Sequence, residues 1–281
     1  MAIDKKKLQT EGTYQAKAPL SSILDEVEEI NCFLQGIEGE RHKLRKFGGL
    51  FMAGGIVLAI GAGVVGINAL AFLAFLAFTC GVGLFIYSFV YGRAMHGHQG
   101  RCQLLKDLFG AHQRDADPRS SFSVRLALKP QPTKLKDEPW PLRKDGREQY
   151  FKEEYLSIEG ELLDGTVLSE SLTELTRKRT FKNPRGKPKV RTRSRYILAL
   201  KFRYPSDVYK DARPAQQALH EEIRVPSSAN VRETTVDEKA ISVKSMVLLD
   251  REIVQASAMS CLGAYRILNL ARRLAATGGA K

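Results

Sequence analysis

The sequence holds little that would mark a secreted or catalytic protein. Its four cysteines are widely spaced and form no CxxC pair, at Cys32, Cys80, Cys102 and Cys261. That spacing argues against a disulfide framework and suits a reducing compartment. The chain has no GxSxG nucleophile motif, no Walker loop and no HExxH zinc motif. We therefore expect a protein that is not an enzyme and that uses no cofactor or metal.

Charge is absent from one long stretch. Residues 47–91 carry no charged side chain and are almost wholly apolar, interrupted near the middle by Asn68. The stretch is twice the ~20 residues that one helix needs to cross a bilayer. Asparagine is a common turn residue because it tolerates left-handed backbone. The sequence therefore predicts an integral membrane protein with a two-helix transmembrane hairpin, its spans at 47–67 and 69–91.

Small residues recur every four positions along both predicted spans. Such a stripe lets two helix backbones approach closely where lipid supplies no hydrophobic drive for association. We expect the stripe to seat one span on the other, through Gly55, Ala59, Gly63, Ala77 and Gly81.

The charges that flank the apolar stretch predict its orientation. Four basic residues stand just before it, at Arg41, Lys43, Arg45 and Lys46. Three more follow it, at Arg93, Arg101 and Lys106. The connection between the spans has no charge, so the positive-inside rule places both termini in the cytoplasm. The expected location is the plasma (inner) membrane, with two passes.

The segments around the hairpin differ in pattern. Residues 1–20 are polar and Lys-rich, and predict a disordered arm. Residues 21–46 predict an amphipathic helix, because Ile23, Val27, Ile30 and Leu34 form one apolar stripe. That stripe favours either a coiled coil between copies, giving a homo-oligomer, or packing on this chain's own last helix. Residues 92–117 predict a juxtamembrane helix.

In residues 118–281 apolar and polar residues alternate with a period of two. This pattern predicts a mainly antiparallel cytoplasmic β-domain. Strands are expected at 122–128, 155–163, 166–182, 190–204, 221–225 and 240–249. Within them, 166–204 predicts a long hairpin. Residues 129–147 predict a surface loop, 226–230 a turn, and 250–276 a final helix. The predicted fold class is therefore an α+β membrane protein.

The end of the long hairpin is strongly basic. Residues 177–195 contain no acid and the basic side chains Arg177, Lys178, Arg179, Lys182, Arg185, Lys187, Lys189, Arg191, Arg193 and Arg195. Like charges on adjacent strands repel, so something besides folding would retain them. A soluble sheet edge, an anionic lipid surface, an acidic protein and nucleic acid all remain open. Phe181 is the one aromatic residue in this segment, which disfavours base stacking.

These features together predict a non-catalytic scaffold or interaction module anchored in the bilayer. Its basic hairpin would bind anionic lipid headgroups or an acidic partner. The alternative is a membrane-tethered, non-specific nucleic-acid binder.

Overall fold

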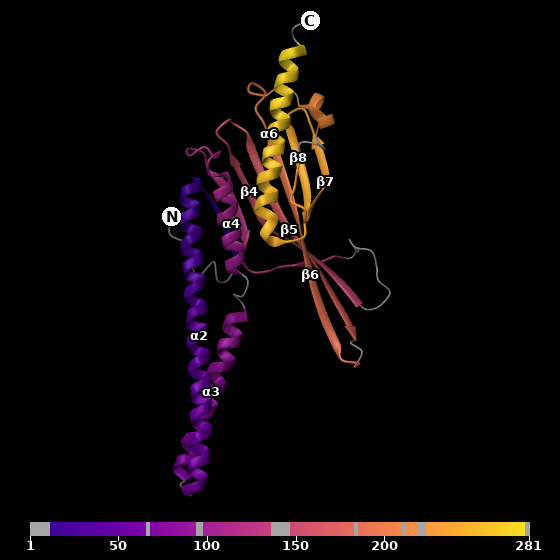
Figure 1. The fold of residues 1–281 in the computed structure, drawn as a ribbon. Coiled ribbons are helices and arrows are strands. Elements are labelled where there is room, and N and C mark those ends of the chain that lie inside the picture. Colours follow the sequence, from indigo (N-terminus) through magenta and orange to yellow (C-terminus); the bar gives the residue numbers. More distant parts are fainter. Residues whose placement is uncertain are drawn as a thin grey trace. The chain divides into compact units, whose positions relative to one another are not determined.

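The computed structural model describes residues 12–65, 68–93, 98–135, 147–182, 185–209, 212–218 and 223–278. It combines helices with an antiparallel sheet (Figure 1). The chain divides into two compact units. The helical unit is Val27–Gln103, and the sheet unit joins Met1–Glu26 to Leu104–Lys281.

The sheet unit is built on strands in the order β1-β2-β4-β5-β6-β8-β7, with β3 paired to β4. Every neighbouring pair is antiparallel. The strands are β1 Thr13–Ala18, β2 Phe122–Ala127, β3 Thr133–Lys134, β4 Arg147–Glu161, β5 Val167–Lys182, β6 Pro188–Arg203, β7 Ala229–Val236 and β8 Ala240–Val247. The antiparallel β-domain that the sequence predicted is therefore present.

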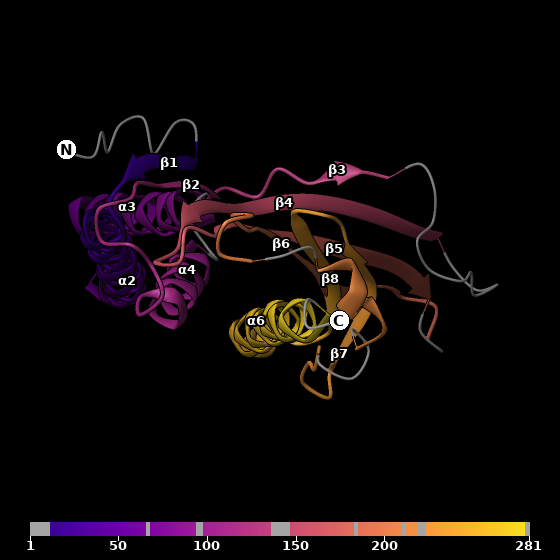
Figure 2. The same ribbon diagram turned by 90° about the horizontal axis from the view of Figure 1, so that it is seen from above.

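The core of the sheet unit lies on one face of this sheet. Helix α6 (Ile253–Gly278), preceded by η2 (Asp250–Glu252), packs on β6 and β8, as Figure 2 shows from above. The ring of Phe109, from α4 (His98–His112), meets Phe122 edge-on at 6.1 Å. Alternate strand residues are buried toward these helices, among them Leu126, Leu156, Ile158, Leu168, Leu172, Leu198, Leu200 and Phe202. The other face of the central strands carries shorter and more polar side chains. A short turn of helix, η1 (Arg213–Ala218), follows β6.

The amino-terminal arm differs from its prediction. We expected disorder over 1–20, but Thr13–Ala18 form β1 and pair with β2 along their whole length. Tyr14 anchors this strand, because it is buried and its hydroxyl donates to Glu26 Oε2 at 2.8 Å. Six residues are too few for a period of two to stand out in a Lys-rich segment. Residues 1–11 lie outside the described part of the chain.

Two further strand predictions were wrong in extent. β4 starts at Arg147, not at 155, so it includes the last residue of the predicted loop at 129–147. β7 occupies Ala229–Val236, where a turn was expected at its start, and the described residues 223–225 of the predicted strand 221–225 are not in a strand. β7 is an edge strand in which Ala229, Val231 and Thr234 are half-buried and Val236 is buried, whereas the residues between them are exposed. A register shift between Val231 and Glu233 interrupts this alternation, so a strict period of two does not show in the sequence.

Helix α2 (Leu20–Val65) and helix α3 (Asn68–Arg93) contain the two apolar segments. α2 runs without interruption through the predicted amphipathic helix and into the first predicted span as far as Val65. Both helices are long and apolar enough to cross a membrane. The predicted stripe of Ile23, Val27, Ile30 and Leu34 is buried within one copy of the chain. α4 is a separate helix from α3, and residues 94–97 between them are outside the described part.

Close backbone contact joins α2 to α3. A Cβ atom on Gly55 would lie 2.9 Å from the Ala74 carbonyl oxygen and 2.9 Å from the Phe78 amide nitrogen. A Cβ atom on Gly81 would lie 2.8 Å from the Gly48 carbonyl oxygen. Two of the predicted contact residues, Gly55 and Gly81, therefore lie where the backbones meet, and sequence reasoning missed Gly48 and Ala74.

The other residues of the predicted stripe lie elsewhere. Ala59 is exposed and lies off the contact, and Ala77 is half-buried. The surroundings of Gly63 are outside the described part. The small residues at the contact are seven positions apart, from Gly48 to Gly55 and from Ala74 to Gly81, and not four. Larger residues of the same contact, Met52 on α2 and Phe78 on α3, lie between them.

Neighbouring glycines in α2 give a matched test of this contact. We expect Gly55→Ala to lower the thermal unfolding midpoint of the full chain in detergent micelles, because overpacking typically costs ~1–3 kcal/mol. Gly54→Ala should leave the midpoint unchanged or raise it, since no atom lies within 4 Å of its added Cβ and alanine favours helix. Equal midpoints for the two variants would contradict the observed packing.

Candidate anion-binding site on the basic hairpin

Four arginines converge on one face of the β5–β6 hairpin. In the strand register Arg177 lies opposite Arg193, and Arg179 lies opposite Arg191. Directly opposed residues of an antiparallel pair project from the same face. The four side chains line a cavity of about 260 Å³. We call these residues the arginine quartet.

A carboxylate from β4 holds the two β5 members of the quartet. Glu148 lies opposite Arg179 in the β4–β5 register, and its side chain is 1 % exposed. Arg177 donates a hydrogen bond to Glu148 Oε1, and the Arg179 Nε lies 3.6 Å from the same oxygen. The Tyr150 hydroxyl donates to Glu148 Oε2 at 2.6 Å. The hydrogen bond from Arg177 is the main cause that lowers the pKa of Glu148, so this carboxylate stays ionised.

The two β6 members differ from the β5 members in exposure. Arg191 and Arg193 are exposed, whereas Arg177 and Arg179 are half-buried. The Arg179 guanidinium also lies 5.6 Å from the centre of the Phe181 ring, within the range of a cation–π contact. The quartet therefore combines two restrained guanidinium groups with two that face solvent.

The other six basic residues predicted for the site are distributed around the hairpin. Lys178 and Lys182 lie opposite Thr192 and Pro188, which places both lysines on the other face. Arg185 and Lys187 belong to the exposed turn around Gly186, whose φ of 74° is left-handed. Lys189 lies opposite Phe181 at the start of β6.

Arg195 occupies a more enclosed position. It is half-buried and its Nη1 lies 3.9 Å from Met246 Sδ. Burial lowers its pKa from the ordinary value, and the nearby charges of Arg232, Arg177 and Arg193 add to that effect. Burial and the neighbouring positive charges therefore both disfavour the charged form of Arg195.

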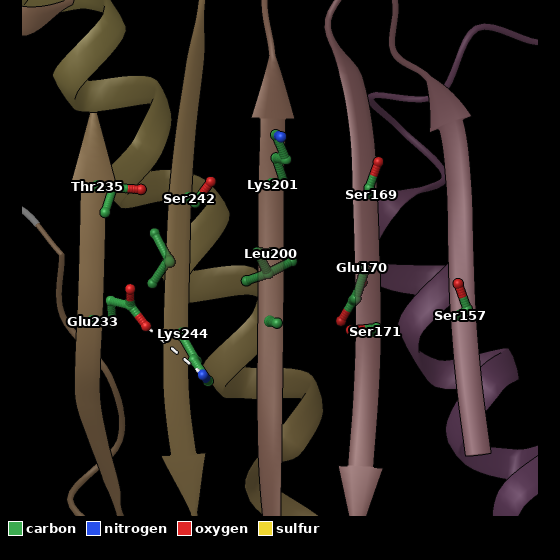
Figure 3. A pocket seen from close by; sticks show the side chains of 12 residues that line it. Ser157, Ser169, Glu170, Ser171, Leu200, Lys201, Glu233, Thr235, Ser242 and Lys244 are labelled. Carbon is green, nitrogen blue, oxygen red and sulfur yellow. Dashed lines mark ion pairs between the residues drawn. The ribbon is translucent and has the colours of Figure 1, made fainter. Parts of the chain in front are cut away.

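A second hollow lies on the same face of the sheet, toward the other end of the hairpin. It has a volume of about 420 Å³ and spans β4, β5, β6, β8 and β7 (Figure 3). Its lining side chains are mostly hydroxyls and lysines, among them Ser157, Ser169, Ser171, Ser242, Thr235, Lys201 and Lys244. Lys244 Nζ lies 3.7 Å from Glu233 Oε2. A small apolar cluster of Tyr150, Leu175 and Ile197 lies on these strands between the hollow and the quartet, and Leu135, which follows β3, packs against it.

The sheet unit also encloses a buried polar cluster that is not a catalytic triad. His112 Nε2 lies 3.3 Å from both Glu170 Oε2 and Ser257 Oγ. A Ser-His-acid triad uses the two ring nitrogens separately, one for the serine and one for the acid. Here one nitrogen faces both partners, and Ser257 is 0 % exposed. This cluster therefore reads as core hydrogen bonding and not as a nucleophile.

A glycine motif in the sequence also carries no site. Residues 61–66 match the GxGxxG spacing of dinucleotide-binding loops. That motif functions between a strand and the start of a helix, whereas residues 61–65 are the end of α2. Among the described residues, no group of three or more His, Cys, Asp or Glu side chains could hold a metal ion.

Comparisons of the chain with known protein families, with curated proteins and with solved structures found no match.

Proposed function

We propose that this protein is a membrane-anchored interaction module whose basic hairpin binds an anionic surface, either lipid headgroups or an acidic protein. The observation that carries the proposal is the arginine quartet around its cavity. Both termini and the sheet unit would lie in the cytoplasm. The protein would act by binding and not by catalysis.

The apolar helices support the membrane part of the proposal. Large apolar side chains of α2 and α3 are exposed, including Leu50, Val57, Val64, Phe72 and Phe75. Soluble proteins rarely expose contiguous apolar surface of this kind, because its contact with water is unfavourable. A bilayer removes that cost, and the flanking basic residues support the cytoplasmic orientation.

The arrangement of the arginines supports binding over a purely structural role. Two pairs of like charges face each other across β5 and β6, which lowers the stability of the hairpin. Residues 188–195 of β6 extend beyond the pairing with β8, so positive charge there also protects a sheet edge. Protection of a sheet edge requires only positive charge. It does not explain why the buried carboxylate of Glu148 contacts two of the arginines.

The test compares two triple variants of the full chain, each held in nanodiscs of zwitterionic phosphatidylcholine. Arg191→Ser with Arg193→Ser and Arg195→Ser should weaken binding of phosphatidylserine vesicles at low salt by roughly 100-fold, from ~1 kcal/mol per basic residue. The difference should shrink as salt screens the charges. The fold should be unchanged or slightly more stable, because repulsion is relieved.

The control variant removes three exposed lysines of the same unit, with Lys201→Ser, Lys239→Ser and Lys244→Ser. Its net charge equals that of the arginine variant, and we expect its vesicle binding to stay near that of the parent. If the arginine variant and the parent bound the vesicles equally at every salt concentration, the proposal would be contradicted. The basic residues would then serve only to protect a solvent-exposed sheet edge. Salt-dependent retention on DNA or RNA without vesicle binding would favour the nucleic-acid alternative.

A further inference from the structure

We infer that the arginine quartet is a binding site for a bisphosphate, meaning two phosphate monoesters carried on one small ring. This inference rests on the proposed function and names the ligand class of the same site. The bisphosphate could be the headgroup of a membrane lipid or a soluble sugar phosphate. General attraction between opposite charges would not distinguish a bisphosphate from other anions. Four features of the arginine quartet favour a bisphosphate over other anions.

The first feature is spacing. Directly opposed side chains start about 5 Å apart, and successive same-face residues along a strand are about 6.6 Å apart. The quartet is therefore a rectangle with two opposed pairs, Arg177 with Arg193 and Arg179 with Arg191. Each pair offers two guanidinium groups to one phosphate. The separation of the pairs suits two phosphates on a single six-membered ring.

The second feature is charge. Four guanidinium groups less the ionised Glu148 carboxylate leave these five side chains with a net charge of +3. A phosphate monoester carries about −1.5 to −2 at pH 7, so a bisphosphate carries about −3 to −4. A single carboxylate or one phosphodiester would neutralise only part of the quartet.

The third feature is residue type. All four members are arginines, although six other basic residues nearby include four lysines. A guanidinium group is a planar fork that donates two parallel hydrogen bonds to phosphate oxygens, whereas an ammonium group acts as a point charge. The positions that face one another therefore carry the side chain suited to phosphate.

The fourth feature is preorganisation in a small space. Glu148 restrains Arg177 and Arg179, and Tyr150, which holds Glu148, belongs to the apolar cluster with Leu175. Restraint before binding lowers the entropic cost of gripping a ligand. A cavity of about 260 Å³ accommodates a headgroup-sized molecule and not a folded partner.

The experiment titrates the full chain, in phosphatidylcholine nanodiscs, with myo-inositol 4,5-bisphosphate and with inositol 4-monophosphate at equal ionic strength. We expect the bisphosphate to bind at least about tenfold more tightly, since it engages both arginine pairs with bidentate bonds. The charge-conserving variant Arg179→Lys with Arg193→Lys changes one member of each pair. It should lose at least about tenfold in bisphosphate affinity, and its loss of phosphatidylserine-vesicle binding should be several-fold smaller than that, because the point charges remain while the bidentate bonds do not.

The outcomes separate this inference from the proposed function. Equal affinity for the two inositol phosphates, or an unchanged bisphosphate affinity in the lysine variant, overturns the bisphosphate site and leaves general anion binding intact. A chain that binds neither inositol phosphate nor phosphatidylserine vesicles overturns both. Vesicles containing phosphatidylinositol 4,5-bisphosphate, compared with the free headgroup, then assign the source: tighter binding of vesicles indicates the lipid, and equal binding indicates a soluble ligand.

Discussion

Replacing Val57 by aspartate should sharply reduce the fraction of full-length chain that inserts into membranes. Val57 is 68 % exposed and lies near the middle of the apolar part of α2. In the proposed bilayer its side chain contacts lipid, and an aspartate at the centre of a span costs about 2.5–3.5 kcal/mol on insertion scales. That cost corresponds to a change of roughly 100-fold in the insertion equilibrium. The measurement is the carbonate-resistant membrane fraction, with total chain measured in parallel.

Leu163 provides the control for the Val57 variant. It is 64 % exposed, close to the 68 % of Val57, but it lies in the turn between β4 and β5 of the sheet unit. Leu163→Asp should leave the membrane fraction unchanged, because water already surrounds this side chain. A Val57→Asp chain that remained in the membrane fraction as completely as Leu163→Asp would contradict a lipid-facing α2.

The parts of the fold with a strong and sustained pattern could be predicted from the sequence. The charge-free stretch predicted α2 and α3, since no other local arrangement accommodates such a run. The alternation through Leu198, Leu200 and Phe202 predicted β6, because one face of that strand is buried against α6. The final helix was also predicted, and its bounds differ from the expected 250–276 by only a few residues.

The strands that the sequence did not predict lack such a pattern for identifiable reasons. β1 is short, and its pairing with β2 depends on a segment more than a hundred residues away. The first half of β4 is polar because its inner side chains, Glu148 and Tyr150, face arginines and a small apolar cluster and not the main core. Tertiary contacts of this kind leave no local signature.

The candidate site was predictable only as a region. The ten basic residues of 177–195 were visible in the sequence, but the convergence of four depends on a register that places Arg177 opposite Arg193. A shift of one residue would move one strand's arginines to the other face. Glu148 was missed because it lies between the loop predicted at 129–147 and the strand predicted from 155, where no element was predicted. The serine-lined hollow was missed because its residues come from five strands.

The orientation of the chain in the membrane tests the central claim most directly. Reporters fused at the amino-terminal end and after Lys281 would be compared with one inserted between Val65 and Asn68, where α2 gives way to α3. The basic flanks and the uncharged connection predict that a cytoplasm-active fluorescent reporter works at both ends. An alkaline phosphatase, which is active only across the membrane, should work at the inserted position alone. Phosphatase activity at the carboxyl-terminal end would place the basic hairpin outside the cytoplasm. Phosphatase activity at one end alone would show an odd number of membrane crossings. Either result would contradict the proposed orientation.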